Sequence, residues 1–213
     1  MAAEFLKKGW RVVGTVRGEL RTGLHQLAED YEGRVEIEPL DINERDQIAA
    51  LHSRLSGRTL DILFVNAGIA THDQNVRIGD VATEEFVRVM VTNALSPMRV
   101  IEALQDLVPA GGLIGAMSSG QGSVANNETG MREVYRGSKA ALNMFMRSFA
   151  ARQPEPRRAM ALMAPGWVRT ELGGPDGRLS IEESVPNLVN VLIERLGTPG
   201  LQYLDYLGRT VPW

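Results

Sequence analysis

Cysteine is absent from this chain, which excludes disulfide bonds, cysteine nucleophiles and zinc–thiolate sites. The three histidines, His25, His52 and His72, lie far apart and show no metal-ligand spacing, so we expect no metal site. No apolar run approaches the ~20 residues of a membrane span. The N-terminal apolar stretch is also too short for a secretory signal. We therefore predict a cytoplasmic protein that does not bind a membrane.

An excess of basic charge is also missing. The net charge is −3, and the basic residues are scattered along the chain, so the sequence does not point to nucleic acid. Lysine itself is scarce, because Lys7, Lys8 and Lys139 are the only three among 23 basic residues. A lone lysine in an arginine-rich part of the chain suggests that the ammonium group of Lys139 has a chemical role.

Short apolar runs alternate with longer amphipathic segments along the whole chain. The short runs predict strands at Trp10–Val16, Arg34–Leu40, Leu60–Val65, Gly112–Met117, Ala159–Ala164 and Leu201–Tyr206. The longer segments predict helices at Glu19–Asp30, Asn43–Leu55, Thr83–Leu107, Met131–Arg152 and Ser180–Leu196, with Asn43 and Thr83 as N-caps.

This alternation is typical of βαβ units and of a parallel sheet covered by helices on both faces. No linker or low-complexity stretch divides the chain. We predict an α/β fold with a doubly wound, Rossmann-like parallel sheet in a three-layer α/β/α arrangement, as one domain over residues 1–213. A ligand site is expected at the carboxyl ends of the strands.

The strongest local signal for chemistry is the pair Tyr135 and Lys139. A spacing of four places both side chains on one face of a helix. A nearby ammonium favours tyrosinate, so Lys139 is expected to lower the pKa of Tyr135 and make it a general acid or base. The alternative is a solvated helix face that happens to carry one lysine.

Other polar residues follow predicted strands, where a ligand would lie. Ser119 follows Gly112–Met117 and can donate a hydrogen bond to a carbonyl, or simply cap a turn. Gly68 follows Leu60–Val65 and can permit close approach of a ligand, or belong to a turn. Asn93 lies inside a predicted helix, either exposed or in a buried polar network.

Taken in order, these motifs resemble those of the short-chain dehydrogenases/reductases. The resemblance covers nearly the whole chain. The loop SSGQGSVANNETG before Tyr135 and the ending YLGRTVPW are similar to the C-factor-like, carbonyl-reductase-like branch. The motif residues are Asn66, Ala67, Gly68, Asn93, Ser119, Tyr135, Lys139, Pro165, Gly166, Val168 and Thr170.

The resemblance implies a catalytic set of four residues. Tyr135 would exchange a proton with the substrate oxygen, and Ser119 would hold the substrate carbonyl. Lys139 would lower the tyrosine pKa and bind the nicotinamide ribose. Asn93 would support Lys139 through a water. Together they imply hydride transfer between a nicotinamide cofactor and a small carbonyl or alcohol substrate.

The resemblance also implies where the cofactor would bind. Asn66, Ala67 and Gly68 would line its adenosine side, with Asp41 against the adenine. Residues 165, 166, 168 and 170 would hold the nicotinamide end. Arg17 follows Trp10–Val16 without an acidic residue beside it, which suits a 2′-phosphate, so we expect NADP, with NAD as the alternative.

The family's first strand and glycine-rich turn do not precede Met1, so the expected fold is incomplete at its N-terminus. In this topology that strand lies between Trp10–Val16 and Leu60–Val65, so its absence leaves two unpaired edges or forces direct pairing. Three explanations stay open: upstream residues exist in the natural protein, the chain is a natural truncation, or another segment fills the gap.

Two functions from different classes remain. The first is an enzyme, which the four catalytic candidates favour. The second is a degenerate, non-catalytic homologue that acts as a binding or interaction protein, which the missing glycine loop favours. By resemblance alone, Thr83–Leu107 and Met131–Arg152 would pack between subunits of a homodimer or homotetramer.

Overall fold

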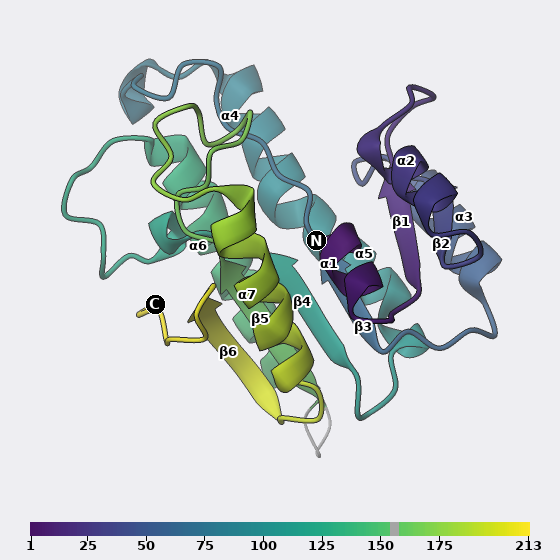
Figure 1. Cartoon of the computed structure of the whole chain (residues 1–213). Coiled ribbons are helices and arrows are strands. Elements are labelled where there is room, and N and C mark those ends of the chain that lie inside the picture. Colours follow the sequence, from purple (N-terminus) through teal and green to yellow (C-terminus); the bar gives the residue numbers. More distant parts are fainter. Residues whose placement is uncertain (154–157) are drawn as a thin grey trace.

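A computed structural model describes residues 1–153 and 158–213 of the chain. Strands and helices alternate along it as the sequence predicts (Figure 1). The strands are β1 (Val12–Val16), β2 (Val35–Pro39), β3 (Ile62–Val65), β4 (Leu113–Met117), β5 (Ala159–Ala164) and β6 (Gly200–Asp205), and their pairings are all parallel.

The helices form the two outer layers of an α/β/α arrangement, as expected. In Figure 1, α1 and α7 lie in front of the strands, while α5 and α6 lie behind them. The helices are α1 (Ala2–Lys7), α2 (Gly23–Asp30), α3 (Arg45–Leu55), α4 (Thr83–Met90), α5 (Ser96–Leu104), α6 (Glu133–Ala151) and α7 (Ile181–Glu194).

Alternate strand residues face opposite helical layers. Leu63 and Val65 of β3 belong to the apolar cluster that contains side chains of α3, α5 and α6. Ile62 and Phe64 pack instead against the cluster that contains side chains of α1 and α7. The two-residue period of a strand therefore buries both faces of the sheet, which explains why the strands read as continuous apolar runs.

The strands form two sheets rather than one. β1 pairs only with β2, and the other sheet has the order β3-β4-β5-β6. Val13 of β1 nevertheless packs against the same cluster as Leu63, so the two sheets share apolar layers. Among the described residues, one edge of β1 and one edge of β3 have no strand partner, so of the two expected outcomes the structure has unpaired edges.

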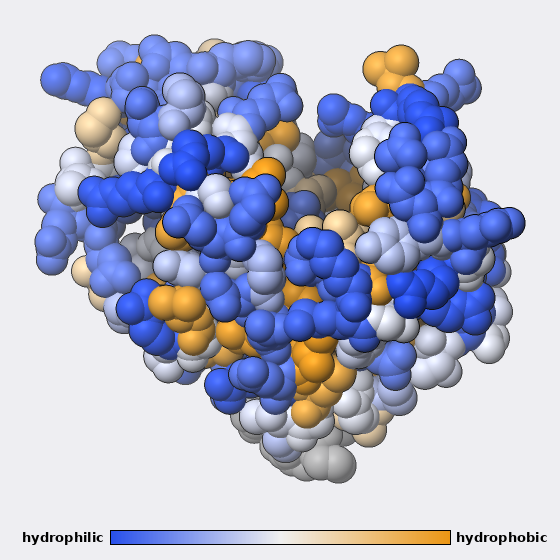
Figure 2. All heavy atoms as spheres, viewed as in Figure 1, coloured by the Kyte–Doolittle hydropathy of each residue, from blue (hydrophilic) through white to orange (hydrophobic). Residues whose placement is uncertain are grey.

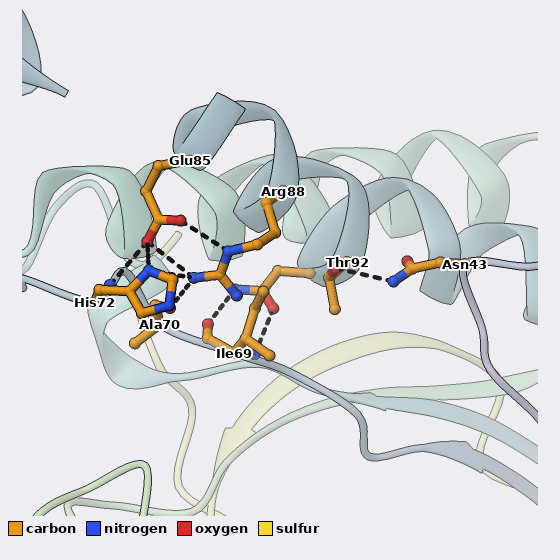
Figure 3. Close-up of polar contacts among 8 residues, drawn as sticks. Asn43, Ile69, Ala70, His72, Glu85, Arg88 and Thr92 are labelled. Atoms are coloured by element: carbon orange, nitrogen blue, oxygen red, sulfur yellow. Dashed lines mark hydrogen bonds and ion pairs between the residues drawn. The ribbon is translucent and has the colours of Figure 1, made fainter. Parts of the chain in front are cut away.

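The predicted N-cap at Asn43 is wrong. Helix α3 begins at Arg45, with Glu44 in the cap position. The Asn43 amide nitrogen donates to Thr92 Oγ1 at 3.3 Å, and its oxygen accepts from Ser96 Oγ at 2.8 Å (Figure 3 shows the first of these contacts). The Asn43 side chain therefore bonds to distant residues, Thr92 and Ser96, and not to the first turn of the helix that we expected it to cap.

The predicted helix Thr83–Leu107 is helical along its length but not uniform. It consists of α4, a π-helix at Val91–Leu95, α5 and a 3₁₀ turn at Gln105–Leu107. Ala82, not Thr83, occupies the N-cap position, so that cap prediction is also wrong. The π-helical turn contains the buried Asn93, and such turns are frequent at functional sites.

Figure 2 shows a hollow with apolar side chains on its floor, at the end of the molecule toward which β1 and β4 point in Figure 1. Within residues 1–153 and 158–213, no helix has the length and apolar character needed to cross a membrane.

Candidate active site

Most of the site residues predicted from the sequence follow the carboxyl ends of four strands. Parallel strands bring these ends to one edge of a sheet. The hollow in Figure 2 opens at that edge. The residues in question are Arg17 after β1, Asn66, Ala67 and Gly68 after β3, Ser119 after β4, and Pro165, Gly166, Val168 and Thr170 after β5.

Lys139 is buried, with 2% of its surface exposed, and it joins α6 to β4. Its ammonium nitrogen donates to the carbonyl of Met117, the last residue of β4, at 2.9 Å. Burial lowers the pKa of Lys139 from 10.5 to about 8. Because burial disfavours the charged form, this ammonium is prepared to release its proton near neutral pH.

Tyr135 lies one helical turn before Lys139, and the ammonium lies 5.8 Å from the centre of its ring. Burial raises the pKa of Tyr135 above its usual value, while the nearby Ser119 side chain and the charge of Arg132 lower it. The net direction is upward, so the expected lowering by Lys139 is not what the structure shows. The structure does bring Tyr135, Lys139 and Ser119 together.

Asn93 is fully buried in a polar network, as one of the two sequence alternatives predicted. Its side-chain oxygen accepts from the Ile69 N–H at 2.8 Å, and its amide nitrogen donates to the Ile69 carbonyl at 2.8 Å. The same nitrogen lies 2.9 Å from Ser138 Oγ of α6. Asn93 thus ties the loop after β3 to the helix that carries Tyr135 and Lys139.

The missing side chain of Gly68 leaves room for the side chains of Lys139 and Asn93, whereas the sequence suggests room for a ligand. A Cβ atom at Gly68 would lie 3.1 Å from Lys139 Nζ and 3.5 Å from Asn93 Oδ1. Any larger residue would therefore press on the ammonium.

Both the backbone carbonyl and the side chain of Ser119 accept hydrogen bonds from the protein. The Tyr203 hydroxyl donates to the Ser119 carbonyl, and the Ser119 hydroxyl accepts from the Gln121 N–H at 3.2 Å. Next to it, Ser118 Oγ donates to the buried Asn143 Oδ1 at 2.6 Å. Sequence reasoning missed Tyr203 and Asn143, because only long-range packing places them under this loop.

The residues predicted for the adenosine side lie apart from this buried cluster. Arg17, Asn66 and Ala67 are exposed, at the ends of β1 and β3. Asp41 already uses one carboxylate oxygen to accept from the Asn43 N–H at 2.9 Å, in the loop after β2.

The residues after β5 form a compact turn. The Pro165 carbonyl accepts from Ser184 Oγ at 2.6 Å, and Gly166 adopts a φ of 81°, which favours glycine. The Thr170 hydroxyl lies in the turn and accepts from the Gly173 N–H at 3.0 Å. Val168 is half-buried beside them. This turn presents backbone groups more than free side chains.

The chain matches the family model described as enoyl-(acyl carrier protein) reductase over residues 1–197. It is 35% identical to the C-signal protein of Myxococcus xanthus over 156 residues, which are 72% of this chain and 93% of that protein. It belongs to the short-chain dehydrogenase/reductase family.

Solved structures of this family superpose on the whole chain. A short-chain dehydrogenase/reductase of Burkholderia multivorans with bound NADP is 66% identical, with a TM-score of 0.98 over 100% of this chain and 92% of that one. A carbonyl reductase of Pseudomonas aeruginosa in complex with NADP is 32% identical, with a TM-score of 0.89 over 100% of this chain and 92% of that one. The predicted family and Rossmann-like fold are thereby confirmed.

In this short-chain dehydrogenase/reductase, a second polar cluster holds the loop after Gly68 (Figure 3). Arg88 of α4 donates to the Ala70 carbonyl at 3.0 Å and to both carboxylate oxygens of Glu85. Glu85 also accepts from the His72 N–H at 2.8 Å. These bonds, led by that of Arg88, lower the pKa of Glu85 to about 2. A spacing of three residues on a helix, as between Glu85 and Arg88, allows an ion pair, and this signal in the sequence was missed.

Proposed function

We propose that this chain is an NADP-dependent oxidoreductase that interconverts a carbonyl compound and an alcohol. The observation that carries this proposal is the pairing of Tyr135 with Ser119, directly beside the buried Lys139. A phenol and a hydroxyl that lie beside each other can both point at one carbonyl oxygen. The dehydrogenase and reductase names of the relatives support the same reaction class.

In the reducing direction, the carbonyl carbon gains a hydride and the carbonyl oxygen gains a proton. The nicotinamide cofactor supplies the hydride when bound. Ser119 orients the carbonyl by donating a hydrogen bond, and Tyr135 transfers its hydroxyl proton to the oxygen. Lys139 replaces that proton, which its pKa of about 8 makes feasible near neutral pH. Asn93 keeps the loop at Ile69 and helix α6 in register.

The residues at and near the strand ends fit the two ends of NADP. Arg17 would pair with the 2′-phosphate, since a guanidinium suits a phosphate group. Asp41, Asn66, Ala67 and Gly68 would line the adenosine side. Lys139 would bind the nicotinamide ribose, and Pro165, Gly166, Val168 and Thr170 would hold the nicotinamide. NADP in the Burkholderia and Pseudomonas structures supports this choice over NAD.

We further propose one domain that assembles into a homodimer or homotetramer through α5 and α6. Met144 and Phe145 of α6, together with Leu95 at the end of the π-helical turn directly before α5, are exposed apolar side chains that a partner subunit would cover. Light scattering after gel filtration tests the assembly, and Phe145→Lys should yield monomers. The cytoplasmic location stays a prediction from the sequence.

The proposed function is tested by calorimetric titration of NADPH, with NADH as the comparison, followed by turnover of a panel of small aldehydes. We expect NADPH to bind more tightly, and Arg17→Ala to reduce that preference. Tyr135→Phe should keep the fold and cofactor affinity but lose about a hundredfold or more in turnover. A folded chain that binds neither nucleotide would favour the alternative, a non-catalytic binding protein.

A further inference from the structure

Arg132 has an unusual backbone conformation directly before the helix that carries the catalytic candidates. Its φ is 62°, and it is the only non-glycine residue with positive φ among the described residues. It occupies the N-cap position of α6, three residues before Tyr135, but its side chain makes no capping hydrogen bond. Left-handed backbone at a residue with a long side chain costs about 1 kcal/mol or more, and such strain gathers at functional sites.

The Arg132 guanidinium lies against an aromatic ring at the same end of the sheet. Its central carbon is 5.8 Å from the ring centre of Trp167, in the turn after β5. Trp167 is itself fixed, because its indole N–H donates to the Gly173 carbonyl at 2.7 Å, yet 41% of its surface remains exposed. The pair therefore presents a positive charge and an apolar surface side by side.

The charge of Arg132 is not neutralised by the protein around it. Among residues 1–153 and 158–213, no carboxylate lies within ion-pairing distance of Arg132. The neighbouring Glu133 instead accepts from the Ile78 N–H at 3.2 Å. Arg136 is engaged too, since it donates to the Met131 carbonyl at 2.7 Å. Arg132 is thus available for an external anion.

Arg132 is also close enough to the proposed chemistry to influence it. Its charge lowers the pKa of Tyr135, opposing the effect of burial. Arg132 lies three residues before Tyr135, and its guanidinium carbon is 5.8 Å from the Trp167 ring in the turn after β5, so it lies at the end of the sheet that carries the site. A substrate held at Arg132 would therefore lie near the Tyr135 hydroxyl.

We infer that the preferred substrates are carbonyl compounds that carry a carboxylate, which pairs with Arg132 while Trp167 covers the apolar part between the carboxylate and the carbonyl. The inference rests on the proposed function and adds the substrate class. The planar guanidinium suits a carboxylate, because the two can form parallel hydrogen bonds. The strained backbone of Arg132 is explained if it aims this group at the site.

The test compares two aldehydes of nearly equal size, 4-carboxybenzaldehyde and 4-formylbenzamide, with NADPH as reductant. We expect kcat/KM to favour the carboxylate in the wild type. Arg132→Gln should reduce that preference by about tenfold or more, as expected for loss of a charged hydrogen bond. Arg132→Lys should restore part of it. Arg132→Asn provides a second neutral variant, since asparagine tolerates left-handed backbone.

Arg147 provides the matched control. It also stacks on a tryptophan, with its guanidinium carbon 4.9 Å from the ring centre of Trp213, and it lies on the same helix. Arg147→Gln removes the same charge and should leave the preference unchanged.

Binding measurements separate this inference from the proposed function. The probe is 4-carboxybenzyl alcohol, titrated by calorimetry with and without NADPH, against its neutral amide. Carboxylate-selective binding that Arg132→Gln abolishes, without turnover of either aldehyde, would uphold the anion site and reject the reductase. Equal turnover of both aldehydes by the wild type and Arg132→Gln would overturn the anion site and leave the reductase standing. Absence of selective binding together with absence of turnover would reject both.

Discussion

Lys139 Nζ lies 3.1 Å from the point where a Cβ atom at Gly68 would be, and it is the nearest atom to that point. The turn after β3 therefore lies against the buried ammonium of α6, although about 70 residues separate Gly68 from Lys139 in the chain. A side chain at residue 68 would require this ammonium, which donates to the Met117 carbonyl, to shift by a few tenths of an ångström.

Gly68→Ala should therefore damage catalysis more than stability. The added methyl group would displace the ammonium that donates to the Met117 carbonyl. We expect aldehyde reduction to fall by up to about tenfold, which is less than the ~10²-fold cost of a full ångström of misplacement in an active site. Gly79→Ala is the control, because no atom lies within 4 Å of its added Cβ. Unchanged turnover in Gly68→Ala would show that the position of Lys139 is not critical.

Lys139→Met should change how stability depends on pH. Because the folded-state pKa of Lys139 is lowered from 10.5 to about 8, the unfolded chain binds the proton more tightly. Stability of the wild type should therefore rise with pH between about 8 and 10.5, and burial of the charge should cost a few kcal/mol below pH 8. Urea unfolding across this window measures the slope, which Lys139→Met should lose. The same slope in both proteins would contradict the lowered pKa.

Asn143→Leu should destabilise the loop that carries Ser119. Asn143 accepts from Ser118 Oγ at 2.6 Å and donates to the Gly122 carbonyl at 3.2 Å, in a buried setting. Leucine leaves both partners unsatisfied, which should cost about 2–4 kcal/mol in urea unfolding. Asn187→Leu on the outside of α7 is the control and should change stability by less than about 1 kcal/mol. Equal effects of the two variants would argue against the network.

Glu85→Gln should destabilise the protein at neutral pH but not in acid. The pKa of Glu85 is lowered to about 2, so its ionised form stabilises the fold above its usual pKa of 4.5. That contribution, about 1 kcal/mol for a partly exposed ion pair, is lost as the pH falls from 4.5 toward 2. The difference between wild type and variant in unfolding free energy should shrink over this range. Glu84→Gln, on an exposed neighbour, should show no such trend.

The unpaired edges of β1 and β3 should be visible in hydrogen exchange. Each strand pairs on one side only, whereas β4 and β5 have partners on both sides. Backbone amides of residues 12–16 and 62–65 should therefore exchange faster than those of 113–117 and 159–164. Equal protection would mean that another segment or a second copy pairs with these edges.

The sequence by itself determined the order of the elements and predicted the class of the site. Apolar runs of strand length and helical periodicity are local properties, and the strand Ala159–Ala164 matches its predicted bounds. The spacing of Tyr135 and Lys139 is also local, because one helical turn places them on the same face. Ser180 follows the same logic, since its capping box with Glu183 lies within four residues.

Only the tertiary structure decided what each polar group contacts. Asn43 serves Thr92 and Ser96 instead of capping a helix, and Gly68 makes room for Lys139. Burial under the sheet edge, which no local pattern encodes, raises the pKa of Tyr135 and lowers that of Lys139. Periodicity reports which face of an element is buried, but the partner across that face depends on how distant segments pack.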